Sequence, residues 1–555
     1  MFINHTGVFY NPEFIDECID KVSSQPFWVE QKDGSIVLDD KMSPSIYLGH
    51  TLPALGFCAL PFGNEILHIQ QNGDGLVREV DIHKLKEFVA YVLNQMPIGN
   101  LVLDQMTQKY SHYFNQNVLT SLRMQFDMKP LRDSRRSAYR FYKNGVVEIT
   151  RDGASLRPYS SIDPDTFVWV DQVINRDFNG SLIEEYDEDL FCSDIGDRPG
   201  HQFHKWLQNL CRNLNGSVWE YDTNKFKPLV SGFGYLLHQY WADHKVVCLV
   251  DDEMQEGEAN GRTGKSVVVK DALEAALDTE VINAKEMSKK NSSSSSNFIF
   301  NFVKPSTQAI TFDDCVEDFN FNSLFSIVTG PMVVNRKYGK MFEFDSKSKP
   351  KLALSSNHPI LGEGFSYEDR QHMITIGNYY KYHKQYLGKT PDQLHGGWLF
   401  DEDWSGLDWQ EFDALCVNSI RFYLTNGLVS GGVSERYKLN KLHASIGSSG
   451  LTNTLARFLE ENVGATTYQF HVDGMDDDQG KRCLKEFVEE SLPGETFTLN
   501  QLSSGLGVVA NHFGYKINVG LKGRPQGRFG PYQKGVNKYI ITSSSKPFGG
   551  SKSSD

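Results

Sequence analysis

The sequence predicts an α/β fold with a parallel-sheet core, an α+β N-terminal region and a small C-terminal module. Residues 245–253 form a continuous apolar run, typical of a buried parallel strand, and a loop and a helix follow it. Shorter apolar runs at 307–315 and 351–354 predict further strands. After residue 500, glycine and serine become frequent and acidic residues rare, which marks the C-terminal module. At roughly 100–200 residues per domain, 555 residues predict three to four domains.

Composition excludes several classes of protein. The net charge is −14, so the surface as a whole repels nucleic acid and anionic membranes, and any such binding needs a local basic patch. None of the eight cysteines forms a CxxC pair or lies at zinc-ligand spacing, which argues against a disulfide scaffold and a structural zinc site. With no signal peptide and no apolar run of ~20 residues, we expect a cytosolic protein without a membrane partner.

The N-terminal half shows local patterns but no catalytic motif. Apolar residues at helical spacing predict a helix at 82–96, whereas the prolines and glycines of 43–57 predict loops and short strands. Residues 139–153 predict a β-hairpin around Asn144-Gly145, and Phe167 and Trp169 lie in another strand-like run. Helices are expected at 204–216, where Asn215-Gly216 is the stop signal, and at 228–242.

A candidate phosphate-binding loop follows the apolar run at 245–253. Backbone amides and a helix N-terminus hold the anion in such a loop. Lys265 would reach the β- and γ-phosphates and Ser266 would ligate Mg²⁺, while alanine occupies the first position, where the full pattern has glycine. The predicted ATP-binding residues are Ala259, Asn260, Gly261, Arg262, Thr263, Gly264, Lys265 and Ser266.

Three polar features after this loop complete a candidate catalytic set. Asp313-Asp314 ends a strand, where one carboxylate can hold Mg²⁺ and the other can orient the attacking water. Asn357 follows the strand at 351–354 and can sense the γ-phosphate. Arg370 precedes a further strand and can reach a neighbouring subunit's phosphate.

Basic residues gather in two places. Val333-Val334 and Met341-Phe342 flank a predicted hairpin tip that contains Arg336, Lys337 and Lys340. Residues 483–542 predict two helices and then strands around a glycine-rich basic loop, a pattern consistent with a winged helix carrying Arg524 and Arg528 in its wing. A plain basic tail is the alternative interpretation of this segment.

The order of these features resembles the superfamily 3 helicase core, an AAA+-like P-loop ATPase of viral, phage and plasmid replication proteins. The closer resemblance is to the helicase half of phage and mobile-element primase–helicases related to the poxvirus type. It extends over 139–430 and is most specific between 232 and 428. The expected segments are an N-terminal α+β domain of unknown role (1–130), an α+β segment (131–227), the ATPase core (228–390), a helical region (391–470), a winged-helix-like module (480–545) and a disordered tail (546–555).

The resemblance implies an ATP-dependent DNA helicase that forms a hexameric ring with ATP sites between subunits. Lys265, Asp313, Asp314 and Asn357 would act within one subunit and Arg370 across the boundary, with Ser266 and Asp313 as Mg²⁺ ligands. Arg336, Lys337 and Lys340 would contact single-stranded or forked DNA, in the cytoplasm of a bacterial host if a phage or mobile element encodes the chain. Whether a separate primase acts with it stays open.

Two alternatives remain at this stage. One is an AAA+ ATPase that remodels or packages nucleic acid without unwinding it. The other is a replication initiator or DNA-binding interaction protein whose ATPase only switches assembly. The hairpin discriminates among them, because only a helicase needs Lys337 and Lys340 on the path of the DNA strand.

Overall fold

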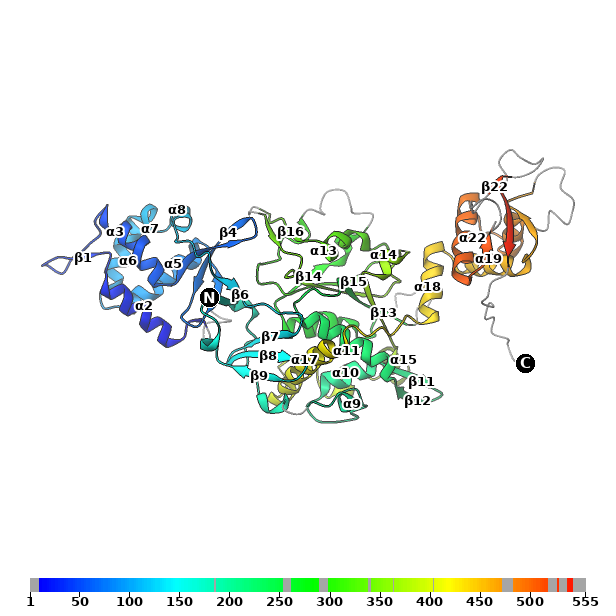
Figure 1. The fold of residues 1–555 in the computed structure, drawn as a ribbon, viewed down its shortest axis with the longest axis horizontal. Helices are drawn as coiled ribbons and strands as arrows, with labels where there is room; N and C mark the ends of the chain where they lie inside the picture. The colour runs from blue at the N-terminus through cyan, green and yellow to red at the C-terminus, as the bar shows by residue number, and fades with distance from the viewer. Residues whose placement is uncertain are drawn as a thin grey trace. The chain divides into compact units, whose positions relative to one another are not determined.

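The computed structural model (Figure 1) describes residues 9–183, 186–252, 261–288, 298–337, 341–362, 364–402, 404–471, 483–517, 527–528 and 537–542. The fold is mixed α/β with a parallel sheet, as the apolar run at 245–253 predicts. The chain divides into two compact units, residues 1–358 with 362–432 and residues 359–361 with 433–555.

The N-terminal region packs helices against a five-stranded sheet with the order β3-β4-β5-β10-β6. The strands are β3 (Phe57–Phe62), β4 (Glu65–Gln71), β5 (Leu76–Glu79), β10 (Thr166–Trp169) and β6 (Lys129–Pro130). A two-stranded ribbon joins β1 (Val29–Glu30) to β2 (Ile36–Val37). The helices are α2 (Pro12–Ser24), α3 (Met42–Ile46), α4 (Leu52–Ala54), α5 (Ile82–Asn94), α6 (Gly99–Gln108), α7 (Tyr110–Tyr113) and α8 (Gln116–Thr120).

Two sequence predictions in this region meet different outcomes. The helix at 82–96 is confirmed as α5, whose Asp81 side chain caps Lys84 N and whose buried face includes Leu85 and Phe88. The prediction of loops and strands at 43–57 is wrong, because α3, a π-turn and α4 occupy most of it. Pro44 lies in the first turn of α3, where a missing N–H breaks no intrahelical bond.

The stretch from 137 to 237 leads into the core. The predicted hairpin is confirmed as β7 (Ser137–Tyr142) and β8 (Gly145–Thr150), which β9 (Ala154–Arg157) extends. The expected helix at 204–216 is only partly right: α10 (Gln202–Leu210) ends early, and β11 (Arg212–Asn215) pairs with β12 (Val218–Tyr221). Gly216 and Ser217 form the hairpin turn between the paired residues Asn215 and Val218, with Gly216 at φ +62°, so the glycine predicted to end a helix begins a tight turn instead.

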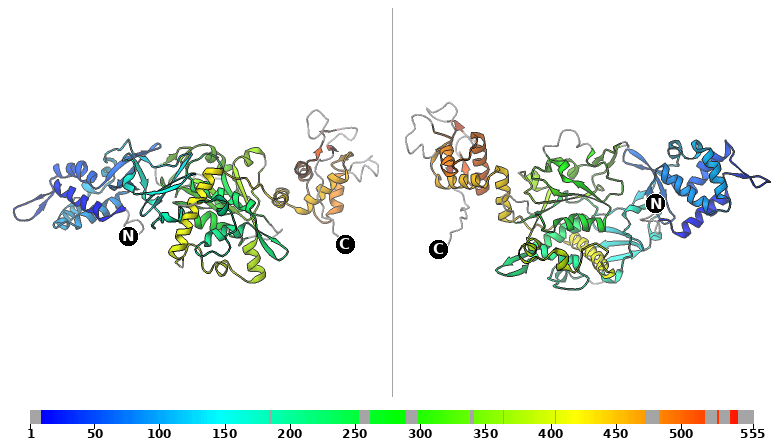
Figure 2. Two further views of the ribbon diagram at one scale, coloured as in Figure 1. Left: turned by 60° about the horizontal axis from the view of Figure 1, so that its bottom comes forward. Right: turned by 180° about the vertical axis from the view of Figure 1, so that it is seen from behind.

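The core is a five-stranded parallel sheet with the order β14-β15-β18-β13-β19. Figure 2 shows the chain from two further directions. Its strands are β14 (Thr279–Asn283), β15 (Ala309–Cys315), β18 (Lys351–Ser356), β13 (Val246–Asp251) and β19 (Gln371–Ile376). All side chains of β13 and β18 are buried, as expected of inner strands of a parallel sheet, although β18 includes the polar residues Lys351, Ser355 and Ser356. The strand order places β18 between the strand of the phosphate loop and the strand of the acid pair.

Helices cover this sheet and extend the core. The predicted helix at 228–242 begins earlier, as α11 (Thr223–Leu237), and packs against α17 (Gly406–Asn426). Gly234 permits the close approach, because a Cβ there would lie 2.0 Å from Ser419 O. The remaining elements are α9 (Glu188–Phe191), α12 (Ala272–Ala276), α13 (Phe325–Thr329), β16 (Met332–Val334), β17 (Phe342–Phe344), α14 (Phe365–Glu368), α15 (Tyr379–Leu387) and α16 (Pro391–His395).

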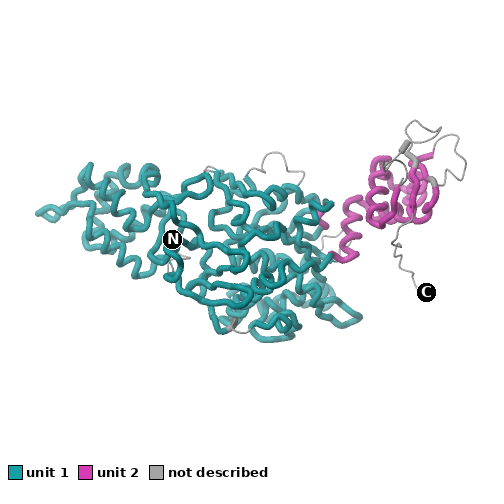
Figure 3. The backbone as a smooth tube through the Cα atoms, in the orientation of Figure 1, with its two compact units in different colours: residues 1–358, 362–432 teal, residues 359–361, 433–555 magenta. Residues whose placement is uncertain are grey.

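The C-terminal unit has its own core (Figure 3). Helices α19 (Ser449–Glu461) and α22 (Leu499–Phe513) pack together with Leu455 and Leu506 fully buried. The other elements are α18 (Glu435–Ile446), β20 (Thr466–Tyr468), α21 (Leu484–Ser491), β21 (Lys516–Ile517), β22 (Gly527–Arg528) and β23 (Asn537–Thr542). The order of two helices followed by strands agrees with the sequence expectation for 483–542.

Candidate nucleotide site

The candidate phosphate loop, called the phosphate loop below, lies between β13 and a helix at the carboxyl edge of the parallel sheet. The described part of the loop runs from Gly261 to Ser266, and Ser266 is the N-cap of the helical stretch that begins at Val267. Gly264 has φ +98°, and a Cβ there would lie 2.9 Å from the ring of Trp206. The Trp206 indole N–H donates to Gly264 O at 3.2 Å, so the loop is fixed from the side of α10.

Lys265 lies buried at the centre of the site and donates three hydrogen bonds. Its Nζ is 2.6 Å from Asp251 Oδ1, 2.9 Å from Thr263 Oγ1 and 2.9 Å from Asn357 Oδ1. Burial lowers the pKa of Lys265, and the Asp251 carboxylate opposes that shift. Burial likewise raises the pKa of Asp251, opposed by Lys265, so each group limits the cost of burying the other.

Ser266 and Asp313 meet on the other side of the loop. Ser266 Oγ donates to Asp313 Oδ1 at 2.8 Å, and the same oxygen accepts from Ser355 Oγ at 2.6 Å. Ser355 Oγ also accepts from the Asp314 N–H at 3.0 Å. Asp314 has φ +54°, a conformation that non-glycine residues rarely adopt, and its side chain is exposed. The backbone therefore turns sharply at Asp314, and the two neighbouring carboxylates have different partners: Asp313 accepts from Ser266, and Asp314 accepts from Asn357.

Asn357 joins the two halves of the site. While Asn357 Oδ1 accepts from Lys265, its Nδ2 donates to Asp314 Oδ1 at 2.6 Å. This bridge exists because β18 lies between β13 and β15, so residues just after β18 lie beside the ends of both neighbours. The predicted residues Lys265, Ser266, Asp313, Asp314 and Asn357 are thus brought together.

These side chains line a cavity of about 720 Å³. The phosphate loop and the acid pair form one part of its wall, and residues after β19 form the rest, among them Lys384, Asp392 and Trp398. Trp398 is 58% exposed although it is a large aromatic side chain. Trp206 stacks on Tyr380 with ring centroids 4.2 Å apart, which joins the two walls. The cavity is large enough for a small-molecule ligand.

The donor set fits Mg²⁺. Ser266 Oγ and the Asp313 carboxylate are hard oxygen donors, and Mg²⁺ is commonly bound by one or two carboxylates together with phosphates and water. Within the described residues, no group of three histidine, cysteine or carboxylate side chains is placed to hold a metal ion. The ion would therefore need phosphate oxygens to complete its coordination.

Arg370 lies at the opposite edge of the sheet from Lys265. It directly precedes β19, whose Gln371 pairs with Val246 at the start of β13, whereas the phosphate loop follows the end of β13. Six strand residues separate the two edges, roughly 20 Å. Arg370 Nη1 donates to Ser366 O at 2.7 Å and its guanidinium lies over Phe325. Arg370 therefore cannot reach the cavity that Lys265 lines in the same chain.

The predicted DNA-binding hairpin is formed by β16 and β17, and we call residues 332–344 the basic hairpin. Arg336 pairs in bidentate fashion with Glu79 of the N-terminal sheet, at 2.9 and 3.3 Å. The guanidinium also lies 4.7 Å from the ring centroid of Phe342. The Lys337 N–H donates to Asn301 Oδ1 at 3.2 Å. One of the predicted cations is therefore engaged by a carboxylate within the chain.

Aromatic contacts secure the basic hairpin to the N-terminal sheet. Phe62 packs edge-on against Phe342 and Phe344, with centroid distances of 5.8 and 5.7 Å. Gly63 has φ +56°, and a Cβ there would lie 2.7 Å from Glu343 O. Only glycine allows so close a backbone approach.

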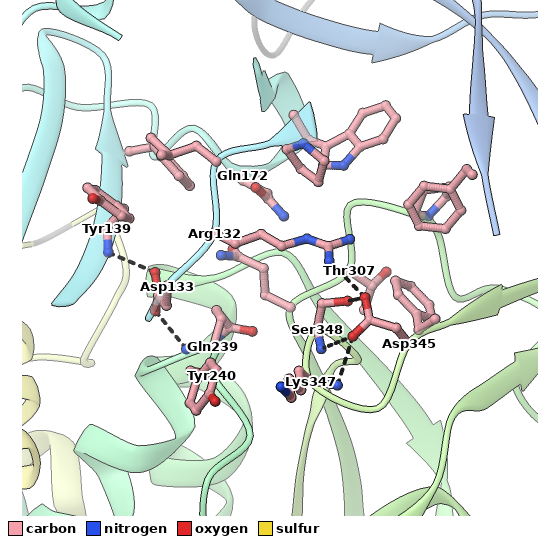
Figure 4. A pocket seen from close by; sticks show the side chains of 18 residues that line it. Arg132, Asp133, Tyr139, Gln172, Gln239, Tyr240, Thr307, Asp345, Lys347 and Ser348 are labelled. Atoms are coloured by element: carbon pink, nitrogen blue, oxygen red, sulfur yellow. Dashed lines mark hydrogen bonds and ion pairs between the residues drawn. The ribbon is translucent and has the colours of Figure 1, made fainter. Parts of the chain in front are cut away.

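A second cavity of about 270 Å³ lies beside this junction (Figure 4). Arg132 Nη1 donates to Asp345 Oδ2 at 2.7 Å, and Asp345 also accepts from the Lys347 N–H. Asp133 accepts from the Tyr139 and Gln239 backbone N–H groups at 2.8 and 2.7 Å. Arg132 and Asp345 pair with each other, and Asp133 is hydrogen-bonded to backbone N–H groups. We therefore interpret this cavity as part of the contact between the N-terminal region and the core.

Several predicted residues fall outside the described part of the chain. Ala259, Asn260, Lys340 and Arg524 are among them. Arg528 belongs to β22, which pairs with β23, and its side chain is not described.

Sequence reasoning missed three residues of the site: Asp251, Ser355 and Trp206. Asp251 ends the apolar run at 245–253, and an acid at the end of a buried strand was the available signal. Ser355 precedes Asn357 by two residues and could have been grouped with it. Trp206 gave no local signal, since its contact with Gly264 spans 58 residues.

The sequence matches no protein-family model and no curated protein. Among the helices of the described ranges, none has the length and apolarity needed to cross a bilayer. Similar solved structures include an apo structure of the NrS-1 C-terminal region, 11% identical, with a TM-score of 0.38, covering 89% of this chain and 98% of that chain. A second apo structure of that region is 13% identical, with a TM-score of 0.32, covering 73% and 96%. Similarity at this level does not extend to shared function.

Proposed function

We propose that this protein is an ATP-driven DNA helicase of the superfamily 3 type, which forms a hexameric ring and acts in the replication of a phage or mobile element. The observation that carries the proposal is the convergence of Lys265, Ser266, Asp313 and Asn357 at the carboxyl edge of a parallel sheet, beside a helix start. That edge is where open α/β sheets bind nucleotides.

In the proposed reaction, each residue has a role that its position supports. Lys265 would neutralise charge on the β- and γ-phosphates, and Ser266 with Asp313 would hold Mg²⁺, which supplies further charge neutralisation. Asp314 would accept a hydrogen bond from the attacking water. Asn357 is hydrogen-bonded to both Lys265 and Asp314, so it would hold the acid in a fixed position relative to the lysine that contacts the γ-phosphate. The water would lie on the exposed side of Asp314.

One observation favours a second candidate, an ATPase that switches assembly or remodels nucleic acid without unwinding it. Glu79 already pairs with Arg336 of the basic hairpin, so this cation is not free for a DNA phosphate unless the pair opens. The test that separates the two is a forked-DNA unwinding assay with ATP, combined with measurement of particle size with and without nucleotide and DNA. ATP-dependent strand separation by a hexamer supports the helicase.

The basic hairpin provides a sharper test. Replacing Lys337 and Lys340 together with alanine is expected to leave basal ATPase intact, because the phosphate loop and Asp313 are untouched, but to abolish DNA stimulation and unwinding. Each lysine that meets a phosphate contributes about 0.7 to the salt dependence on single strands, so the slope of log K against log salt should become shallower by about 1.4.

The matched control replaces two exposed lysines elsewhere, Lys129 and Lys143. Lys143 also lies in a hairpin turn, so this control removes the same charge from a similar setting. An unchanged salt slope and wild-type unwinding by the Lys337 and Lys340 variant would favour the switch or remodelling ATPase.

Arg370 provides a test of ring assembly. Since Arg370 lies roughly 20 Å from its own phosphate loop, Arg370→Ala should abolish hydrolysis through the neighbouring subunit's site while ATP binding persists. Mixing Arg370→Ala with Lys265→Ala protein should restore part of the ATPase, because some interfaces then have both residues intact. The control mixture, Lys265→Ala with Asp313→Asn, should restore none, because both changes lie on the same side of an interface. Mixed rings that assemble yet stay inactive would exclude a role in trans.

A further inference from the structure

The ammonium group of Lys265 has no proton left for a phosphate. A lysine ammonium carries three N–H donors, and here they meet Asp251 Oδ1, Thr263 Oγ1 and Asn357 Oδ1, all within 2.9 Å. A phosphate oxygen can therefore bond to Lys265 only by exchange with one of these three acceptors. Two of them are neutral, and Asp251 is the acidic one.

Asp251 is built into the site. It is the last residue of β13, its side chain is 1% exposed, and its Oδ1 also accepts from Thr263 Oγ1 at 2.7 Å. Its Oδ2 is buried and has no hydrogen-bond partner among the described residues. A buried carboxylate with one unpartnered oxygen depends strongly on the cation that is hydrogen-bonded to its other oxygen, here Lys265.

We propose that Asp251 is a positioning residue that orients Lys265 within the phosphate loop and competes with nucleotide phosphates for its ammonium group. The Asp251–Lys265 pair holds the lysine at the cavity wall, so that nucleotide entry exchanges one anionic partner for another. The affinity for nucleotide then depends on the difference in free energy between the Lys265–phosphate pair and the Lys265–Asp251 pair that it replaces. This inference rests on the proposed function, because it requires that the phosphate loop binds nucleotide.

The decisive variant is Asp251→Asn, which keeps an acceptor oxygen for Lys265 and Thr263 but removes the charge. The dissociation constants of ATP and of inorganic tripolyphosphate are measured on the full chain. Both are expected to fall about tenfold, because the phosphates no longer displace a charge-assisted bond. In steady state, KM for ATP should fall without a rise in kcat, a signature that simple structural support does not produce.

Asp252→Asn is the matched control. It removes the same charge at the next position, but Asp252 pairs with Lys225 at 3.1 Å instead of with Lys265. Its effect on either dissociation constant should stay within about twofold, as is usual for a charge removed outside the site. Asp251→Ser, which removes the same charge without introducing an amide, replaces Asp251→Asn if that variant does not fold.

A double-mutant cycle with Lys265→Ala completes the test. If Asp251 acts through Lys265, the gain in affinity from Asp251→Asn must disappear in the Lys265→Ala background. Unchanged or weaker nucleotide binding by Asp251→Asn overturns the inference, and so does a gain that persists without Lys265. If the wild-type chain binds neither ATP nor tripolyphosphate in a Lys265-dependent manner, the proposed function fails, and the inference fails with it. The two failures are thus distinguished by the wild-type titration.

Discussion

Lys265→Ala is expected to lower the rate of ATP hydrolysis about 10³-fold. The lysine lies in the phosphate loop between Gly264 and Ser266, beside Asn357 and close to the acid pair. Its loss removes the cation that lies in the loop itself and is placed to neutralise charge developing on the transferred phosphoryl group. The measurement is steady-state phosphate release at saturating ATP with Mg²⁺.

The same substitution leaves the buried Asp251 carboxylate without its cation, which costs about 3 kcal/mol of stability. Thermal unfolding must therefore show that the variant is folded at the assay temperature. Lys270→Ala, which removes a lysine from the following helical stretch, is the matched control and should keep wild-type activity. Near-normal hydrolysis by folded Lys265→Ala protein would show that nucleotide is bound elsewhere.

Asp313→Asn is expected to reduce hydrolysis about 10²-fold and to raise the Mg²⁺ concentration needed for half-maximal activity. Asp313 Oδ1 accepts from Ser266, Ser355 and the Asp314 N–H, and asparagine can retain these three bonds through its carbonyl oxygen. The variant therefore changes charge with little change of shape. Magnesium titrations of the hydrolysis rate measure the effect.

Glu317→Gln removes an exposed carboxylate just beyond the same strand and should behave as the wild type. A wild-type rate and an unchanged Mg²⁺ requirement for Asp313→Asn would place the metal on other residues. If hydrolysis is lost but the Mg²⁺ concentration needed for half-maximal activity is unchanged, Asp313 holds the loop in place through its hydrogen bonds and does not bind the metal.

The central strand, the loop and helix after it, and the position of the acid pair at a strand end could be predicted from the sequence because their signals are local. An unbroken apolar run such as 246–250 has few interpretations besides a buried strand, and Gly264-Lys265-Ser266 follows it in the chain after one loop. Asn357 was found for the same reason, at the end of its own strand. The grouping of these residues required only that parallel strands end at a common edge.

Contacts between distant segments could not be predicted. Asp251 and Lys265 are fourteen residues apart and meet only because the loop returns to the strand end. Arg336 and Glu79 are 257 residues apart, and neither residue has a pattern that identifies the other. The hairpin at 212–221 was missed for a different reason, because a glycine such as Gly216 serves equally well as a helix stop and as the first residue of a tight turn.

The attachment of the basic hairpin to the N-terminal sheet has a mechanical consequence. Phe62 packs against Phe342 and Phe344, and Arg336 of the hairpin pairs with Glu79 of the N-terminal sheet. These contacts couple the hairpin to an N-terminal region that has its own hydrophobic core. If ATP turnover displaces the hairpin, the N-terminal domain must travel with it as a lever arm, or the aromatic wedge must open once per stroke. The load borne by a DNA strand would then be shared by residues far from the nucleotide, which gives the N-terminal region a part in force transmission.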